Sequence, residues 1–153
     1  VADVDELLRR GVRVALGNDG FSNNMWAEWK TAYLLHKVWK RDPRSADGDT
    51  IMEMAVRHSS ALATQFFPAA PLGVLSAGAQ ADIIFVDYHP TTPLTAANLP
   101  WHILFGFEAS MVDTTLCAGK VLMRNRELLT LDEEEITARS RELADGVWKR
   151  FSG

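Results

Sequence analysis

The chain has 153 residues, enough to bury a hydrophobic core but too few for a complete (β/α)8 barrel of about 250 residues. Its net charge of −4, without a cluster of Lys and Arg, disfavours nucleic acid and anionic membranes as partners. A single cysteine, Cys117, excludes an internal disulfide and a thiolate metal cage, which favours the cytoplasm. The sequence begins with Val1 rather than Met, so we expect a processed chain or a fragment, and its acidic start leads us to expect no signal peptide.

Hydrophobic periodicity in the first part of the chain predicts helices around one strand. In chain order we expect a helix over 3–10, a short buried strand over 12–17 (VRVALG), a helix over 24–41 and a helix over about 50–66. Thr50 or Asp49 can cap the last of these helices, and Pro68 follows its end.

The second part of the chain predicts mainly strands. In chain order we expect a strand over 81–88 that is buried on nearly both faces, an irregular helix over 94–107 interrupted at Pro100, two or three antiparallel strands within 111–128, and an amphipathic helix over 132–151. Gly146 should end or fray the last helix early, and this helix must dock its apolar face on another surface. Cys117 is expected to be a small buried residue, and Asp82 and Asp87 to terminate the 81–88 strand by binding backbone amides or water.

The stretch LGNDGFSNN, residues 16–24, carries the candidate chemistry because it joins the predicted strand to the next helix. In a parallel α/β barrel the catalytic side chains come from this end of the strands. A carboxylate there, such as Asp19, can bind a divalent metal and deprotonate a metal-bound water, whose pKa the metal lowers to about 7. Asn-Asp-Gly is also ideal for a plain turn or cap before a helix, and the residue pattern alone favours that interpretation of Asp19.

The string ALGNDGFSNN, preceded by ELLRRGVRV, resembles the eighth strand and following loop of the metal-dependent amidohydrolase superfamily. The most similar branch contains cytosine and guanine deaminases, S-adenosylhomocysteine deaminase and the triazine chlorohydrolases. Downstream, MAVRHSSALA, PLGVLSAGAQADIIFVDY and VDTTLCAGKVLM resemble the segments that lead into and close its small domain. The ending, from GKVLMRNREL to VWKRF, is most similar to aminohydrolases associated with selenium metabolism, and the resemblance covers essentially the whole chain.

The resemblance implies an α/β fold that is the C-terminal part of a (β/α)8 metallo-hydrolase barrel plus part of its small composite β domain. Residues 1–66 would be the last βα portion of the barrel, 67–130 a segment of the small β domain, and 131–153 a C-terminal docking helix.

For the site, the resemblance assigns Asp19 to the strand-eight aspartate that ligates the metal and acts as general base and proton shuttle. Ser22 and Asn23 match loop positions beside it that brace the loop and touch substrate, and Asn18 stands where the family usually has Thr. His58 stands where the family often has Asn, and we expect it to be packed and hydrogen-bonded.

The superfamily's remaining ligands, a His-x-His pair and two further histidines, would lie upstream of such a segment. The four histidines present are scattered and match no ligand position. Because a catalytic zinc site normally takes three protein ligands, Asp19 alone cannot hold one. We therefore expect zinc or iron in the complete parent protein, and no bound metal and no activity in this chain alone.

The function implied for the parent is hydrolysis of a non-peptide C–N bond, or of C–Cl, at a heterocyclic or amidine-like carbon. Metal-activated water would attack, and Asp19 would pass its proton to the departing ammonia. The expected partners are a small-molecule substrate and further copies of the chain. The alternative is a non-catalytic, truncated α/β module that self-associates through apolar helix faces and unpaired strand edges.

Overall fold

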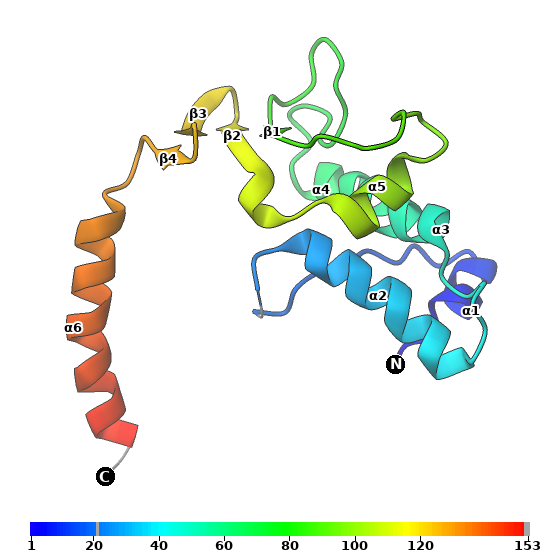
Figure 1. Ribbon diagram of the computed structural model, residues 1–153, viewed down its shortest axis with the longest axis horizontal. Helices are drawn as coiled ribbons and strands as arrows, with labels where there is room; N and C mark the ends of the chain where they lie inside the picture. Colours follow the sequence, from blue (N-terminus) through cyan, green and yellow to red (C-terminus); the bar gives the residue numbers. More distant parts are fainter. Residues whose placement is uncertain (21, 152–153) are drawn as a thin grey trace.

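The computed structural model describes residues 1–20 and 22–151 and has a mixed α/β architecture. Its helices are α1 (Val4–Arg9), α2 (Met25–Lys40), α3 (Gly48–Met52), the π-helix η1 (Glu53–His58), α4 (Ser59–Phe66), α5 (Leu99–Gly106), the 3-10 helix η2 (Ala109–Met111) and α6 (Glu133–Phe151). Its strands are β1 (Ile83–Val86), β2 (Val112–Cys117), β3 (Lys120–Arg124) and β4 (Glu127–Leu128). Figure 1 shows α1 to α5 packed together, the strands at the edge of this bundle, and α6 standing apart from both.

The hydrophobic core lies inside the helical bundle. Its buried members are Val4, Ala46, Ile51, Met54 and Leu104. Side chains of α2, among them Trp29, Ala32 and Tyr33, pack against this cluster. The core therefore joins α1, the long 48–66 helix and α5, which are distant in the sequence.

The predicted helix over 50–66 is confirmed, and it starts slightly earlier at Gly48 as the continuous run α3, η1 and α4. Its cap is Asp47, whose Oδ1 accepts a hydrogen bond from the Thr50 backbone N–H at 2.9 Å. The expectation that Thr50 or Asp49 caps this helix is therefore wrong. Thr50 is itself the backbone donor that the cap satisfies.

Ion pairs fix α1 to the end of α2. The Lys40 ammonium contacts the Asp3 carboxylate and lies 3.4 Å from Oδ2 of Asp5. The hydrogen bond between Lys40 and Asp3 lowers the pKa of Asp3 and raises the pKa of Lys40. Asp5 also accepts hydrogen bonds from the Ser45 hydroxyl and, at 3.1 Å, from the Ala46 backbone. The first helix is thus tied to both ends of the α2–α3 connection.

The strands form one antiparallel sheet in the order β1-β2-β3-β4. The predicted strands within 111–128 are confirmed, and two tight turns join them. Ala118 and Gly119 have φ of 50° and 78°, and Asn125 and Arg126 have φ of 51° and 64°. Two successive left-handed residues are what a two-residue hairpin with the right-handed sheet twist requires.

The prediction of a strand over 12–17 is wrong in this structure. The sheet formed by the described residues contains β1 to β4, and segment 12–17 pairs with none of them. A strand exists only where a neighbour exchanges backbone hydrogen bonds with it, and no described segment lies alongside 12–17 in this way. One backbone group of the segment, the Val14 carbonyl, lies 2.9 Å from Nδ1 of His58, which confirms the packed role expected for that histidine.

The sheet is more open than expected. Ile84 and Phe85 of β1 are 48% and 56% exposed, so the prediction of a strand buried on both faces is wrong. Cys117 at the end of β2 is also exposed, contrary to expectation. Asp82 does bind a backbone amide, as expected, accepting a hydrogen bond from the N–H of Ala118 at 2.7 Å.

Two expectations about helices fail for local reasons. Pro100 does not interrupt a helix but lies in the first turn of α5, where its missing N–H costs nothing. Gly146 does not end α6, which continues to Phe151.

Among the described residues, no helix combines the length and the apolar character needed to cross a lipid bilayer.

Candidate functional site

The candidate site is the loop between segment 12–17 and α2, with Asp19 in its turn. Asp19 and Gly20 have φ of 46° and 76°, so two successive residues are left-handed and the chain reverses sharply. Asp tolerates this conformation better than most residues with a side chain, and Gly adopts it freely. The Asp19 side chain is exposed, and no described residue hydrogen-bonds or ion-pairs with its carboxylate. Both oxygens are therefore available to a ligand.

Asn18 organises the loop behind Asp19. Its Nδ2 donates to the Ser22 carbonyl oxygen at 2.8 Å and to Oδ1 of Asn23 at 3.1 Å. The structure thus brings Asn18, Ser22 and Asn23 together and leaves Asp19 projecting from the turn. From the sequence, Asn18 stood out only as a departure from the family's Thr, although its two amide donors were a signal for this role.

The far end of the loop is fixed to α2 by side-chain capping. Oγ of Ser22 accepts a hydrogen bond from the Asn24 backbone at 3.2 Å. Oδ1 of Asn24 in turn accepts from the backbone N–H groups of Trp26 and Ala27 at 3.2 and 3.3 Å. Ser22 therefore helps to hold the residue that caps the helix, which gives the loop a rigid anchor.

The residues of this chain do not by themselves fit a catalytic metal. No group of three or more His, Cys, Asp or Glu side chains able to hold an ion occurs among the described residues. The four histidines all contact other groups: His36 the carbonyls of Ala2 and Ala32, His58 that of Val14, His89 the Asp87 carboxylate, and His102 the Tyr88 hydroxyl. Asp19 can supply one ligand, which is fewer than the three that catalytic zinc sites take.

A mostly apolar pocket of about 320 Å³ lies next to the loop. Asn23, Trp26 and Trp29 line it from the loop and α2, and Ile84 and Val112 line it from the sheet. Within the described part of the chain, the buried Nε1 of Trp29 has no hydrogen-bond partner. This pocket offers an apolar surface close to the residues that position Asp19.

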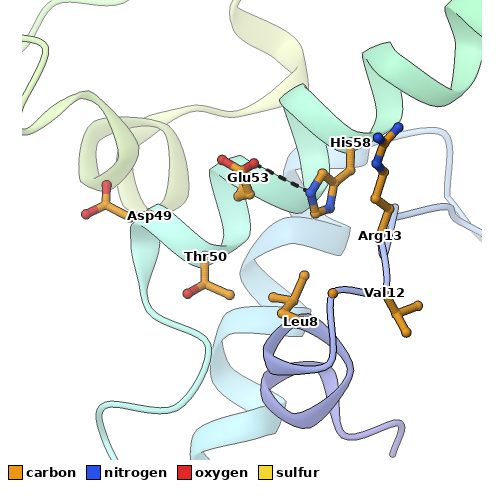
Figure 2. Close-up of a pocket in the computed structure, with 8 residues that line it drawn as sticks. Leu8, Val12, Arg13, Asp49, Thr50, Glu53 and His58 are labelled. Atoms are coloured by element: carbon orange, nitrogen blue, oxygen red, sulfur yellow. Dashed lines mark ion pairs between the residues drawn. The ribbon is translucent and has the colours of Figure 1, made fainter.

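A larger hollow of about 550 Å³ lies at the other end of segment 12–17, beside Val12 and Arg13 (Figure 2). His58 and Glu53 face each other there, with Nε2 and Oε1 3.5 Å apart. Glu53 also pairs with Arg57 at 2.5 Å, so its carboxylate is already engaged. We place the candidate site at the Asp19 loop because the Asp19 carboxylate has no partner among the described residues and is held in a turn braced by Asn18.

The family of the chain follows from a match to the amidohydrolase family over residues 1–122. The match includes the Asp19 loop, the helical bundle and most of the sheet. The chain belongs to the amidohydrolase family.

Curated relatives are named as deaminases. The chain is 35% identical to 5'-deoxyadenosine deaminase of Methanosarcina acetivorans, covering 98% of this chain and 34% of the relative. It is also 35% identical to 5-methylthioadenosine/S-adenosylhomocysteine deaminase of Dictyoglomus thermophilum, covering 89% of this chain and 32% of the relative. The chain thus spans about a third of the length of the curated relatives that it matches.

Solved structures share the fold. An adenosine deaminase from Xanthomonas campestris with bound zinc superposes with a TM-score of 0.76 at 23% identity, over 97% of this chain and 34% of that one. An atrazine chlorohydrolase from Arthrobacter aurescens complexed with zinc gives a TM-score of 0.68 at 22% identity, over 94% and 32%. The arrangement of helices and strands described above therefore occurs within larger amidohydrolases.

Proposed function

We propose that this chain is the C-terminal third of a metal-dependent aminohydrolase that removes an amino group from a heterocyclic small molecule. The observation that carries the proposal is the exposed Asp19 carboxylate, held in a braced turn inside a segment that matches the amidohydrolase family. The deaminase names of the relatives favour a 6-aminopurine nucleoside as substrate. Water would add to the carbon that bears the amino group, and ammonia would leave.

Asp19 acts in this proposal as the proton carrier. Its carboxylate takes a proton from the attacking water and delivers it to the amino nitrogen, which then leaves as neutral ammonia. Asn18, Ser22 and Asn23 hold the turn so that the carboxylate stays in one place, and Asn23 borders the apolar pocket. A divalent metal, zinc or iron, would make water reactive at neutral pH.

The remaining metal ligands would come from residues outside this chain. Support comes from the zinc in solved relatives and from the single available carboxylate in the loop. Residues 1–66 would complete a barrel, 67–130 would form part of a small β domain, and 131–153 would dock as a helix. The chain alone would be inactive and metal-free. Its exposed, unpaired Cys117 favours a cytoplasmic location, and its exposed apolar residues favour a homo-oligomer.

The test uses the complete protein, including the part upstream of Val1, and measures ammonia release from adenosine and 5'-deoxyadenosine. Asp19→Ala should lower kcat by about 10²- to 10⁴-fold, the range for loss of a general acid–base group. Asp49→Ala is the matched control, because it removes an exposed carboxylate outside the loop. Full turnover in the Asp19→Ala protein would refute the proposal. One equivalent of tightly bound zinc in the 153-residue chain alone would refute the shared-ligand part.

A further inference from the structure

Segment 12–17 leads directly into the Asp19 turn, and its backbone is held to the helical bundle at a single point. The side chains of Val14 and Leu16 pack against the hydrophobic core. Within the described part of the chain, the one hydrogen bond made by the backbone of residues 13–17 joins the Val14 carbonyl to Nδ1 of His58 at 2.9 Å. The His58 side chain is 17% exposed, so this contact is largely shielded from water.

The hydrogen of this contact lies on His58. A carbonyl oxygen only accepts hydrogen bonds, so Nδ1 is the donor whether the imidazole is neutral or protonated. The other ring nitrogen, Nε2, faces Oε1 of Glu53 at 3.5 Å (Figure 2). The Val14 oxygen has a second lone pair, so a strand of the complete protein that pairs with the segment can bond to it at the same time. The contact from His58 therefore does not depend on segment 12–17 being unpaired.

A local irregularity of the 48–66 helix ends at His58. Glu53–His58 form the π-helix η1, with α-helix before and after it. A π-turn takes up an extra residue, so the side chains at its end are turned by about 100° relative to a continuous α-helix. Oγ of Ser59 donates to the carbonyl of Met54, five residues earlier, at 3.0 Å and so supports the wider turn. Such turns occur frequently at functional sites, and this one presents the side chain that holds segment 12–17.

We propose that His58 is a positioning residue for Asp19. Its N–H holds the Val14 carbonyl, and with it the segment that ends at the Asp19 turn, in a fixed place on the helical bundle. Asn18 braces the turn itself, whereas His58 sets where the braced turn lies relative to the substrate. A displacement of about 1 Å can lower a rate about 10²-fold, so such an anchor matters even at a distance from the reacting atoms. The inference rests on the proposed function, because it assigns His58 a role in the same site.

Two substitutions in the complete protein separate the hydrogen bond from packing. His58→Leu keeps an apolar side chain of similar bulk but removes the N–H. His58→Asn is smaller, but its Nδ2 lies two bonds from Cβ, as Nδ1 of histidine does, and can donate to the same carbonyl. His58→Leu should lower kcat for ammonia release about 10- to 100-fold and change KM less than about threefold. His58→Asn should keep kcat within about threefold of wild type.

The matched control is His89→Leu, because the His89 side chain is 92% exposed and lies outside segment 12–17 and the 48–66 helix. This control should leave kcat unchanged. A His58→Leu protein with the kcat of wild type would overturn the proposal. So would a His58→Leu protein that is more active than His58→Asn, because that order is the one expected from packing alone.

A double variant shows whether His58 acts through Asp19. Asp19→Ala already removes the group that His58 positions, so adding His58→Leu should lower the residual kcat less than about twofold. A general loss of structure would instead multiply the two single losses. Multiplied losses in the double variant would therefore overturn the proposal.

Hydrogen exchange tests the anchor without reference to activity. In the complete protein, the backbone amides of 13–17 should exchange about fivefold faster in His58→Leu than in wild type, as expected for the loss of one hydrogen bond, and at nearly the wild-type rate in His58→Asn. Unchanged exchange in His58→Leu would overturn the anchor. Full turnover in Asp19→Ala would refute the proposed function, whereas an impaired Asp19→Ala beside a fully active His58→Leu would refute the present inference alone.

Discussion

Gly106 at the end of α5 is the position where a single methyl group should do the most local damage. A Cβ at this position would lie 2.5 Å from the Tyr88 hydroxyl oxygen and 2.9 Å from Cε2 of the same ring. Both distances are shorter than non-bonded carbon contacts allow, so Gly106→Ala must displace the Tyr88 ring. Tyr88 shares a hydrogen bond of 2.7 Å with Nδ1 of His102, and the displacement breaks it.

The expected cost of Gly106→Ala has two parts. Overpacking costs about 1–3 kcal/mol, and the lost hydrogen bond costs about 1 kcal/mol more. The free energy of unfolding should therefore fall by about 2–4 kcal/mol. For a chain of this size each kcal/mol lowers Tm by about 2–4 °C, so the loss in Tm should be about 4–16 °C.

Thermal unfolding followed by circular dichroism measures this change. Gly146→Ala is the matched control, because nothing lies within 4 Å of a Cβ placed there. The control should stabilise α6 by about 0.5–1 kcal/mol through helix propensity alone. Tyr88→Phe combined with Gly106→Ala removes the nearest clashing atom and should cost less than the sum of the two single changes. A Gly106→Ala protein as stable as the wild type would refute the packing argument.

Two further predictions concern the loop and the response to acid. In the complete protein, Asn18→Ala should lower kcat about tenfold because it loosens the Asp19 turn. Asn18→Thr keeps a hydrogen-bonding group and should lower kcat by a smaller factor. Equal kcat values for Asn18→Ala and wild type would contradict the bracing role. The hydrogen bonds from Arg44 lower the pKa of Asp42 to about 2. Because the folded-state pKa lies below the unfolded value, this contribution to stability is complete above about pH 4 and is lost as pH falls towards 2. The difference in the free energy of unfolding between wild type and Asp42→Asn should therefore shrink as the pH falls from about 4 to about 2. A difference that stays constant from about pH 5 to about pH 2 would show that the charge of Asp42 does not contribute to stability.

The sequence predicted well those parts of the fold that depend on neighbours along the chain. The helix at 24–41 follows from apolar spacing and the Asn24 cap, and the turn at Asn125-Arg126 follows from residues that accept positive φ. Segment 12–17 failed because a strand also needs a partner, and the β-branched run says nothing of whether one is present. Pro100 was misread because proline in a first helical turn and proline in a helix interior look alike until the helix start is known.

For the site, the sequence located the loop but not its internal bonding. Asp19 could be singled out because a carboxylate follows a predicted strand end directly. The double hydrogen bond of Asn18 depends on the left-handed turn at Asp19 and Gly20, which folds Ser22 and Asn23 back towards it. That closure is three-dimensional, so the identities of the residues alone did not reveal it.

Segment 12–17 also bears on the order of events during folding. The turns of α2 and the β2–β3 hairpin close over short loops, and such local contacts form early. If the barrel of the proposed parent supplies the neighbours of segment 12–17, their pairing closes a long loop and comes late. Asp19 directly follows this segment, so its braced turn is brought to the remaining parts of the proposed site only at that final stage. Backbone amides of 12–17 should then exchange rapidly in the isolated chain and be protected in the complete protein. Protection of this segment would mark the stage of folding at which the proposed site is assembled.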